Sequence, residues 1–494
     1  MRRRLFCVLL ACLVLSGCSQ VTVFEPVLSS EAGESLQEEI LSPEVLRLPV
    51  NATDSLNPYS LVSQANRSAI ALLYDGLFAL TPEYGIEARI ASSASMEGGT
   101  WRVLLRSGVL FSDGSAVTAQ DVFYSFQLAY AESSPYRAHL RQVQSCTVQD
   151  NAVIFTLTQP NSLFCNTLTF PIVKNGTGGA DIPVGSGRFS VASSDSSGIM
   201  LVPGREAARC GPIRAVQLVA LDDDATLASS LKVGVIDMMQ TTQSTRDELL
   251  SGVSSQSLDI NTLGYLAINR SGVLSGAAVR RAIYLAINRE ELAQWSYGSK
   301  AEAAYTPFNP LVNWLPDAEF VGRDGLARAM TILDEAGFLA EEGSIRGNEE
   351  GEELRMELLV NSDNEIRTAA AQRLSDQLAR AGIAVTVVGK PYESYIEDYN
   401  AGRYDLCLAE MQLGDDMNLD LVLPGISSFY GNLSTRYTAF LADIDGVDPF
   451  LAEFMEENPF IPLIYRHGTV ASSRNFRAYI VATKWDIFYN MADW

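Results

Sequence analysis

Residues 100–129 read TWRVLLRSGVLFSDGSAVTAQDVFYSFQLA, and this stretch decides the fold that the sequence predicts. Residues 101–105 alternate with the two-residue period of a strand that buries one face. The Ser-Asp-Gly-Ser sequence at 112–115 then favours a tight turn. Thr118 stands three residues before Asp121, which is typical of a capped helix start. The stretch therefore predicts a strand, a turn and a helix in succession.

This stretch also resembles the signature of the family 5 extracellular solute-binding proteins, the peptide-, nickel- and opine-binding subunits of ABC importers. That signature has a Trp on a strand, then LR.GV.FSDG and T..DV.YSF. The matching residues here are Trp101, Leu105, Arg106, Gly108, Val109, the FSDG sequence at 111–114, Thr118, Asp121 and Val122. We interpret most of them as holding one βα unit together rather than contacting a ligand. The resemblance implies an α/β, periplasmic-binding-protein-like two-lobed fold (class II, cluster C type) with an extra inserted domain.

The N-terminus has the pattern of a secretory signal. Arg2, Arg3 and Arg4 precede an apolar run at 5–15 that is too short to span a bilayer. The Leu-Ser-Gly-Cys that follows resembles a bacterial lipobox, which implies cleavage before Cys18 and a lipid on that residue. An ordinary signal peptide with an incidental cysteine is the alternative.

Several later segments match the same family or predict elements by their own pattern. Motifs that resemble the family lie at 182–189 (IPVGSGRF), 234–237 (GVID, expected as a strand), 264–269 (GYLAIN, a strand) and 278–289 (a helix). Residues 148–157 alternate and predict one strand. Strand and helix patterns then alternate over 354–360, 365–381, 383–388, 394–401 and 404–409. Such alternation predicts an α/β lobe built from βαβ units.

The resemblance covers residues 45–494 and implies three domains. Domain I would comprise 44–72, 184–265 and 463–494, with domain II at 73–183 and domain III at 266–462, after a signal at 1–17 and a lipidated flexible tether at 18–43. Hinge strands near 265–270 and 458–465 would let two lobes close on a ligand.

Composition narrows the class of protein. A chain of 494 residues is too long for one core, so several domains are expected. The formal net charge of -23 argues against nucleic acid as a partner, because such a surface repels phosphates. Four cysteines follow the signal, Cys146, Cys165, Cys210 and Cys407, and no CxxC pair occurs among them. We expect buried free thiols, with a disulfide between Cys165 and Cys210 as the alternative.

The candidate ligand contacts follow the predicted strand at 404–409. In peptide-binding members of the family, a carboxylate shortly after a YDL strand grips the peptide's amino terminus. This chain reads YDLCLAEMQLGDDM there and lacks the family's Trp and DYPDP. Met411 occupies roughly the Trp place, and Asp415 or Asp416 the carboxylate place. The two acids are expected either to contact ligand or to form a solvated loop pair, and Glu410 is a further candidate.

Four more candidates lie near predicted lobe junctions: Tyr59, Tyr265, Asn269 and Tyr430. Aromatic and polar side chains of this kind line small-ligand sites. Core or surface positions are the alternative for each of them.

An enzyme finds little support in the sequence. The two histidines, His139 and His467, are far apart, and neither HExxH nor a GxSxG elbow is present. We therefore expect no catalytic residues, no cofactor and no metal.

The resemblance and the signal together predict a monomeric, lipid-anchored substrate-binding protein of an ABC importer on the outside of a cell membrane, at the extracellular surface or in the periplasm. It would capture a peptide or a similar amine-bearing small solute and deliver it to a permease with its ATPase. The alternatives are a nickel-chelate or other non-peptide solute binder, a surface sensor or chaperone-like lipoprotein, and a secreted hydrolase.

Overall fold

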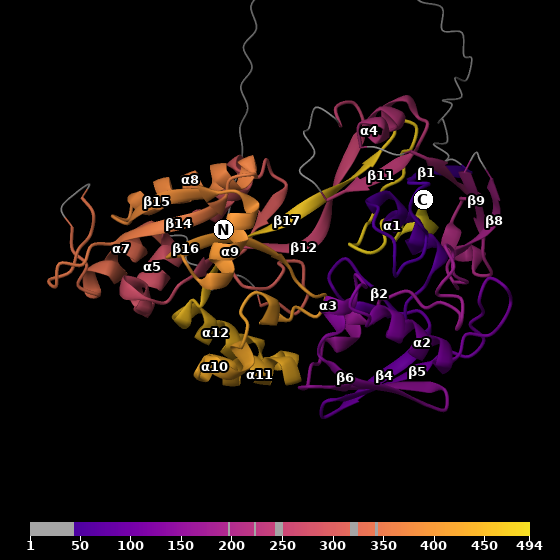
Figure 1. Ribbon diagram of the computed structural model, residues 1–494, viewed down its shortest axis with the longest axis horizontal. Coiled ribbons are helices and arrows are strands. Elements are labelled where there is room, and N and C mark those ends of the chain that lie inside the picture. Colours follow the sequence, from indigo (N-terminus) through magenta and orange to yellow (C-terminus); the bar gives the residue numbers. More distant parts are fainter. Residues whose placement is uncertain (1–43, 196–197, 222–223, 243–249, 317–324, 341–343) are drawn as a thin grey trace, which may run out of the picture. The chain divides into compact units, whose positions relative to one another are not determined.

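The computed structural model in Figure 1 describes residues 44–195, 198–221, 224–242, 250–316, 325–340 and 344–494. The predicted signal, Cys18 and the tether lie outside the described residues. No helix among the described residues combines the length and the apolar character needed to cross a membrane.

One four-stranded sheet joins the start of the described chain to residues near 200. Its order is β1 (Val45–Val50), β10 (Ala215–Ala220), β9 (Gly198–Pro203) and β8 (Phe189–Asp195). β1 and β10 are parallel, whereas the other pairs are antiparallel. Residues far apart in the sequence therefore share this sheet. Helix α1 (Gln64–Leu73) lies between β1 and the small β2–β3 ladder (Phe78–Leu80 and Ile86–Ala88) in the chain order.

Residues 100–129 form the predicted strand, turn and helix. β5 (Thr100–Leu105) lies between β4 (Ala91–Glu97) and β7 (Ala152–Leu157), and β6 (Val143–Gln149) pairs with β7. Helix α2 (Ala119–Ala129) follows the turn and begins with a capping box at Thr118, and the short α3 (Arg137–Leu140) precedes β6. The single strand predicted at 148–157 is wrong. The chain turns at Asp150, where φ is +53°, so the segment contributes to both strands of a hairpin.

A seven-stranded mixed sheet carries most of the second half of the chain. Its order is β11 (Met238–Thr241), β17 (Phe460–Ser472), β12 (Ser254–Ile268), β16 (Leu406–Gln412), β14 (Arg355–Asn361) and β15 (Ala384–Lys390), with β13 (Ala301–Ala303) paired to β17. β14 is parallel to both β15 and β16, which confirms the predicted βαβ units.

The strand predicted at 234–237 is wrong, because the strand begins at Met238. Gly234 adopts φ +77° and turns the chain after α4 (Asp224–Val233). Asp237 is buried and bonds Arg47 through both backbone and side chain, so regular pairing starts only one residue later.

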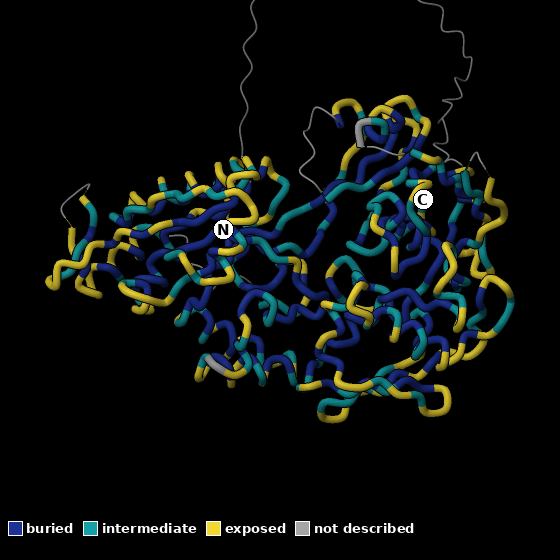
Figure 2. Tube along the Cα trace, viewed as in Figure 1, coloured by how far each residue is buried: buried dark blue, intermediate teal, exposed yellow. Residues whose placement is uncertain are grey.

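Among the described residues, eight helices of the second half of the chain lie between the strands of this sheet in the sequence. They are α5 (Ala277–Ala286), α6 (Arg289–Trp295), α7 (Gly325–Glu335), α8 (Glu365–Ala379), α9 (Tyr392–Ala401), α10 (Ile426–Phe429), α11 (Asn432–Ala442) and α12 (Val447–Glu457). In Figure 2 the buried residues follow the interiors of the sheets, and the exposed residues lie at outer turns and on the outer faces of strands and helices.

The end of the chain packs in the same hydrophobic core as its start. Phe476, Phe488 and Met491 share one buried cluster with Leu46 and Leu48. Separate clusters form around the β14–β16 region. The chain therefore returns to its first sheet after β17, although the domain bounds given above remain a prediction.

The four described cysteines are free, and three of them are buried. Burial raises the pKa of the thiols of Cys165 and Cys407 to about 12, so these thiols stay protonated at neutral pH.

The capping box of α2 generates a stability prediction. The Asp121 carboxylate accepts hydrogen bonds from the backbone N–H (2.9 Å) and hydroxyl (2.6 Å) of Thr118 and from the backbone N–H of Asn175 (2.8 Å). Asp121→Ala should lower the free energy of unfolding by about 2–3 kcal/mol, because a helix cap and a loop contact are lost together. Urea denaturation measures the loss. The exposed neighbour Gln120 is the control, and an equal loss in Gln120→Ala would contradict the assignment.

Candidate ligand-binding site

The candidate acidic residues lie where β16 leaves the sheet. Residues 406–409 are buried between β12 and β14, and β16 continues along β12 to Gln412, with Glu410 opposite Gly264. The loop at 413–418 that follows is tied back to β12. The buried Asn261, at φ +50°, donates from its side chain to the carbonyl of Gly414 (3.1 Å).

Glu410 is paired with two arginines. Its side chain is 4% exposed and accepts hydrogen bonds from Arg367 of α8 (2.7 Å), Arg466 of β17 (2.9 Å) and the hydroxyl of Tyr297 (3.3 Å). Burial by itself raises the pKa of Glu410, but the two guanidinium groups outweigh it and hold that pKa below its ordinary value. Glu410 is therefore an ionised carboxylate whose partners carry one excess positive charge.

Asp415 is paired with the C-terminal segment of the chain. Its carboxylate is 2% exposed and accepts hydrogen bonds from Lys484 Nζ (2.9 Å) and from the indole N–H of Trp485 (2.6 Å). The Lys484 side chain is 6% exposed and its Nζ lies 4.7 Å from the centre of the Trp485 ring. The chain itself therefore supplies a cation for this buried acid.

Within the part of the chain that the structure describes, Asp416 has no cationic partner and is held by neutral groups. Its carboxylate, 2% exposed, accepts hydrogen bonds from the side-chain amides of Gln142 (2.6 Å) and Asn161 (2.8 Å). Burial raises the pKa of Asp416 to about 6, because amide donors offset only part of the cost of burying a charge. Asp416 therefore exchanges a proton close to neutral pH while joining the 413–418 loop to the β6–β7 region.

His139 lies beside these acids. Its Nδ1 is buried and has no hydrogen-bond partner among the described residues, and its ring meets the Trp485 ring edge-on at a centroid distance of 6.0 Å. Burial, assisted by the charge of Lys484, lowers the pKa of His139 to about 4, so this imidazole is neutral at physiological pH.

The expectation of a solvated loop pair at Asp415 and Asp416 is wrong, since both side chains are buried and partnered. The alternative, that they contact ligand, stays a prediction. A ligand amine can reach Asp415 only by replacing Lys484 or by binding next to it, because an additional buried cation needs its own counter-charge.

The structure connects Tyr59 and Tyr265 to this region in different ways. Tyr59 meets Tyr136 at a ring distance of 5.9 Å, and Tyr136 meets Trp485 at 5.7 Å, so an aromatic chain leads from Tyr59 to the partner of Asp415. Tyr265 lies opposite Ala409 in the sheet, and its hydroxyl bonds that of Tyr399 (2.8 Å).

The other candidates have contacts within their own surroundings. Asn269 donates to the carbonyl of Gly402 (3.1 Å), and the half-buried Tyr430 lies 5.8 Å from the guanidinium of Arg270. Met411 is half-buried on β16 and packs against the neighbouring hydrophobic cluster. No contact joins Asn269 or Tyr430 to the Asp415 carboxylate among the interactions of the described residues.

Sequence reasoning missed the partners that define the site. They are His139, Gln142, Asn161, Tyr297, Arg367, Arg466, Lys484 and Trp485. These residues are distant from the acids along the chain, so no local spacing points to them. The one feature of the sequence that could have pointed to this region is its pair of histidines. His139 contacts Trp485, and His467 lines a hollow together with Lys484.

A hollow adjoins Lys484, and we call it the Lys484 hollow. It has a volume of about 250 Å³ and is lined by Leu80, Thr81, Pro82, Tyr84, Ser257, Asp259, Glu302, Leu311, His467, Ala482, Thr483 and Lys484. Asp259 accepts hydrogen bonds from the hydroxyl of Tyr84 and from the amide of Asn309 (3.0 Å). The hollow therefore presents carboxylates and basic groups beside apolar walls. Within the described ranges, no three His, Cys, Asp or Glu side chains gather as a metal site would require.

Comparison with known proteins agrees with this fold. Residues 85–425 match the family model of bacterial extracellular solute-binding proteins, family 5. Protein XP55 of Streptomyces lividans is 26% identical over 365 residues, which make up 69% of this chain and 65% of that protein. The chain thus spans less than two thirds of that relative's length.

Two solved structures share the architecture over nearly their whole length. The unliganded open form of the periplasmic murein tripeptide binding protein MppA has a TM-score of 0.74 at 18% identity, covering 88% of this chain and 94% of that one. The nickel ABC transporter structure from Bacillus halodurans has a TM-score of 0.74 at 21% identity, covering 90% and 97%. The α/β two-lobed fold of periplasmic binding proteins is confirmed, and the chain belongs to the family 5 bacterial extracellular solute-binding proteins.

The buried pair of Asp415 and Lys484 yields a prediction. Lys484→Met removes the cation and leaves a buried carboxylate with only the Trp485 donor, so the free energy of unfolding should fall by about 3–5 kcal/mol. The double variant Asp415→Asn with Lys484→Met should recover much of that loss, since no unpaired charge remains. Urea denaturation of the two single variants and the double variant measures the coupling. Additive losses would show that the pair contributes no coupling.

Asp416 yields a prediction of pH dependence. Its pKa is about 6 in the folded protein and about 3.9 when unfolded, so between these values the folded state holds a proton that the unfolded state lacks. The contribution of Asp416 to the free energy of unfolding is therefore fully present below pH 4 and is lost as pH rises through 6. Relative to Asp416→Asn, the wild type should lose roughly 2 kcal/mol of unfolding free energy between pH 4 and 7.

Urea denaturation at a series of pH values measures this difference. The same substitution at the exposed Asp376 of α8 is the control, and its profile should follow that of the wild type. Parallel profiles for Asp416→Asn and the wild type would overturn the assignment.

Proposed function

We propose that this protein is the solute-binding subunit of an ABC importer, and that it captures a peptide or a similar amine-bearing small solute beside Lys484. A lipid on Cys18 would hold it at the outer face of a membrane, and a tether at 19–43 would let it reach its permease, whose ATPase drives import. The protein itself would carry out no chemistry. Membership of family 5 supports this role, and so does the likeness in fold to a murein tripeptide binding protein.

The proposed solute class rests on one observation, which is that residues of both charges line the Lys484 hollow. Asp259 and Glu302 lie on its wall together with Lys484, His467 and several apolar residues. A zwitterion presents an amine and a carboxylate, and each end of it would meet an opposite charge here, as burial of a charged group requires. Leu80, Pro82, Leu311 and Ala482 would contact its apolar part.

The size of the hollow limits the solute. Its volume of about 250 Å³ lies just below the range for small-molecule sites, roughly 300–1,000 Å³, so a short peptide suits it better than a long one. A hinge motion of the two lobes would enlarge or close the hollow as solute enters.

Native mass spectrometry tests the proposal. The chain from residue 19 onward is purified gently from rich medium, and masses are recorded after denaturation. We expect a mixture of short-peptide masses. Glu302→Gln should reduce the retained fraction several-fold, because Glu302 is a half-exposed carboxylate of the hollow and, among the described residues, its nearest basic partner is His467 at 4.0 Å. Glu357→Gln, the same change at an exposed position of β14, should leave retention unchanged.

The other outcomes separate the alternatives. A single non-peptide or metal-containing mass would overturn the peptide assignment and favour a nickel-chelate or other solute binder. A protein that stays empty against peptide and metal libraries would favour a sensor or chaperone-like lipoprotein, and turnover of peptides would favour a hydrolase. Loss of growth on the identified solute in a host that lacks this protein would distinguish import from sensing.

A further inference from the structure

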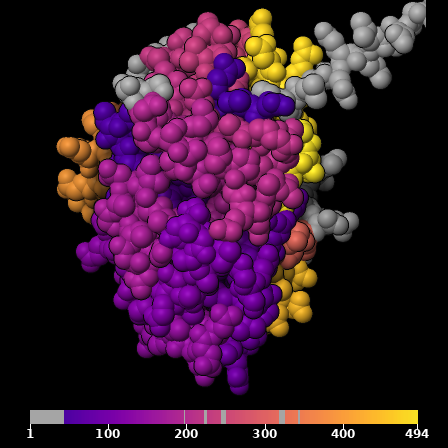
Figure 3. All heavy atoms as spheres, turned by 90° about the vertical axis from the view of Figure 1, so that its right-hand side faces the viewer, coloured from indigo at the N-terminus to yellow at the C-terminus, as the bar shows by residue number. Residues whose placement is uncertain are grey.

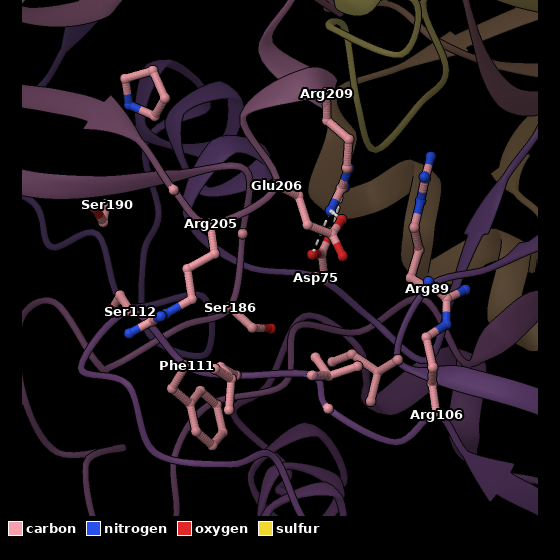
Figure 4. A pocket seen from close by; sticks show the side chains of 17 residues that line it. Asp75, Arg89, Arg106, Phe111, Ser112, Ser186, Ser190, Arg205, Glu206 and Arg209 are labelled. Atoms are coloured by element: carbon pink, nitrogen blue, oxygen red, sulfur yellow. Dashed lines mark hydrogen bonds and ion pairs between the residues drawn. The ribbon is translucent and has the colours of Figure 1, made fainter.

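A second and larger hollow lies away from Lys484, among the elements of the first half of the chain. It has a volume of about 470 Å³ and is shown in Figure 4. Its lining residues are Asp75, Arg89, Ile90, Arg106, the segment 108–112, Ser186, Gly187, Ser190, the segment 203–206 and Arg209. We call it the arginine hollow. It shares no lining residue with the Lys484 hollow.

The segments that form this hollow come from two motifs recognised in the sequence. Residues 108–112 belong to the strand–turn–helix stretch, and Ser186 and Gly187 belong to the glycine-containing turn at 182–189. The Ser112 backbone N–H donates to the carbonyl of Gly185 (2.9 Å), so the two motifs are bonded to each other at the wall of the hollow. Figure 3 views the side of the molecule that carries β8 and β9, which is built mainly from the indigo-to-magenta part of the chain.

The charge of the arginine hollow is opposite to that of the protein. Four arginines line it against two acids, whereas the chain as a whole has a formal net charge of -23. Arg209 is neutralised, because Asp75 accepts two hydrogen bonds from it (2.8 and 2.7 Å) and Glu206 a third (3.1 Å). Asp75 and Glu206 are therefore engaged with Arg209, and the other arginines give the hollow its excess positive charge.

The remaining arginines keep donors available. Arg89 pairs with Glu87 (3.1 Å), which does not line the hollow, and Arg106 donates to the carbonyl of Ala88 (3.0 Å). No carboxylate partner of Arg106 or Arg205 occurs among the ion pairs of the described residues. In the view of Figure 4, Arg205 lies on one side of Ser186, and Arg89 and Arg106 lie on the other.

Ser186 supplies an independent observation. Its Oγ is buried and makes no hydrogen bond among the described residues, although it lines the hollow. An unpaired buried hydroxyl is costly, so native proteins usually provide it with a partner. A ligand oxygen in the hollow would be such a partner.

We propose that the arginine hollow is a second binding site, and that its ligand carries a phosphate group. Guanidinium groups form forked, charge-assisted hydrogen bonds with the oxygens of a phosphate, and serine hydroxyls complete such sites. The volume leaves room for an organic phosphate as well as for the inorganic ion. The proposal stands independently of solute capture beside Lys484.

Isothermal titration calorimetry of the full-length protein in mild detergent tests this site, at constant ionic strength. The probes are inorganic phosphate and glycerol 3-phosphate, which distinguish a free ion from an organic phosphate. We expect saturable one-to-one binding of at least one probe. Arg205→Gln should weaken it at least tenfold, as for the loss of a charge-assisted hydrogen bond. Ser186→Ala should weaken it several-fold without lowering the temperature of thermal unfolding, because among the described residues that hydroxyl has no hydrogen bond to lose and its burial unpaired is costly.

Arg102→Gln is the matched control. Arg102 is exposed on β5, bonds Gln149 (2.8 Å) and does not line the hollow, so binding should be unchanged in this variant. Absence of saturable heat with both probes at millimolar concentration would overturn the proposal. So would equal weakening in Arg102→Gln and Arg205→Gln, which would indicate unspecific attraction. Peptide retention measured by mass spectrometry should stay the same in Arg205→Gln, so failure of one proposal leaves the other standing.

Discussion

The antiparallel pairing of β12 with β17 is the interaction on which the candidate site depends. These two long strands join residues about two hundred positions apart, from Ser254 opposite Ser472 to Ala267 opposite Phe460. The ladder places Arg466 beside Glu410 and directs the chain after Ser472 back to the first core, where Lys484 reaches Asp415. An irregularity in the ladder between Asp259 and Thr262 contains Asn261, whose side chain holds the loop at 413–418.

Buried charge explains why the acids of the site make so many hydrogen bonds and ion pairs. Glu410, Asp415 and Asp416 lie within one short segment, and three carboxylates this deeply buried need partners to offset lost hydration. Each takes its partners from a different part of the chain: arginines for Glu410, a lysine and an indole for Asp415, and two amides for Asp416. Such pairs contribute less to stability than to the choice of one arrangement, because the cost of burial cancels most of the attraction. Here that arrangement keeps a lysine at the edge of a hollow.

The two hollows differ in the charge of the residues that line them. The Lys484 hollow contains both signs at short range, which suits a solute that is itself neutral overall. The arginine hollow concentrates positive charge on a strongly acidic protein. Long-range repulsion weakens the approach of anions to such a surface, so an anion would be held only where several guanidinium groups act at contact distance.

The sequence by itself determined the local elements and the family. The strand, turn and helix at 100–129 follow from residue period, turn chemistry and a three-residue cap spacing, all of which act within one segment. Local pattern failed where a turn residue at Asp150 divided an apparently continuous strand and where the Asp237 contact with Arg47 preceded the pairing of β11. Only the tertiary structure decided that Asp415 and Asp416 are buried, with Lys484 paired to Asp415 and side-chain amides bonded to Asp416. It also decided that the motifs at 108–112 and 182–189 meet at the wall of the arginine hollow. Those features depend on pairing between strands and segments far apart in the chain, and no residue spacing within a segment specifies which distant charge will neutralise a buried acid.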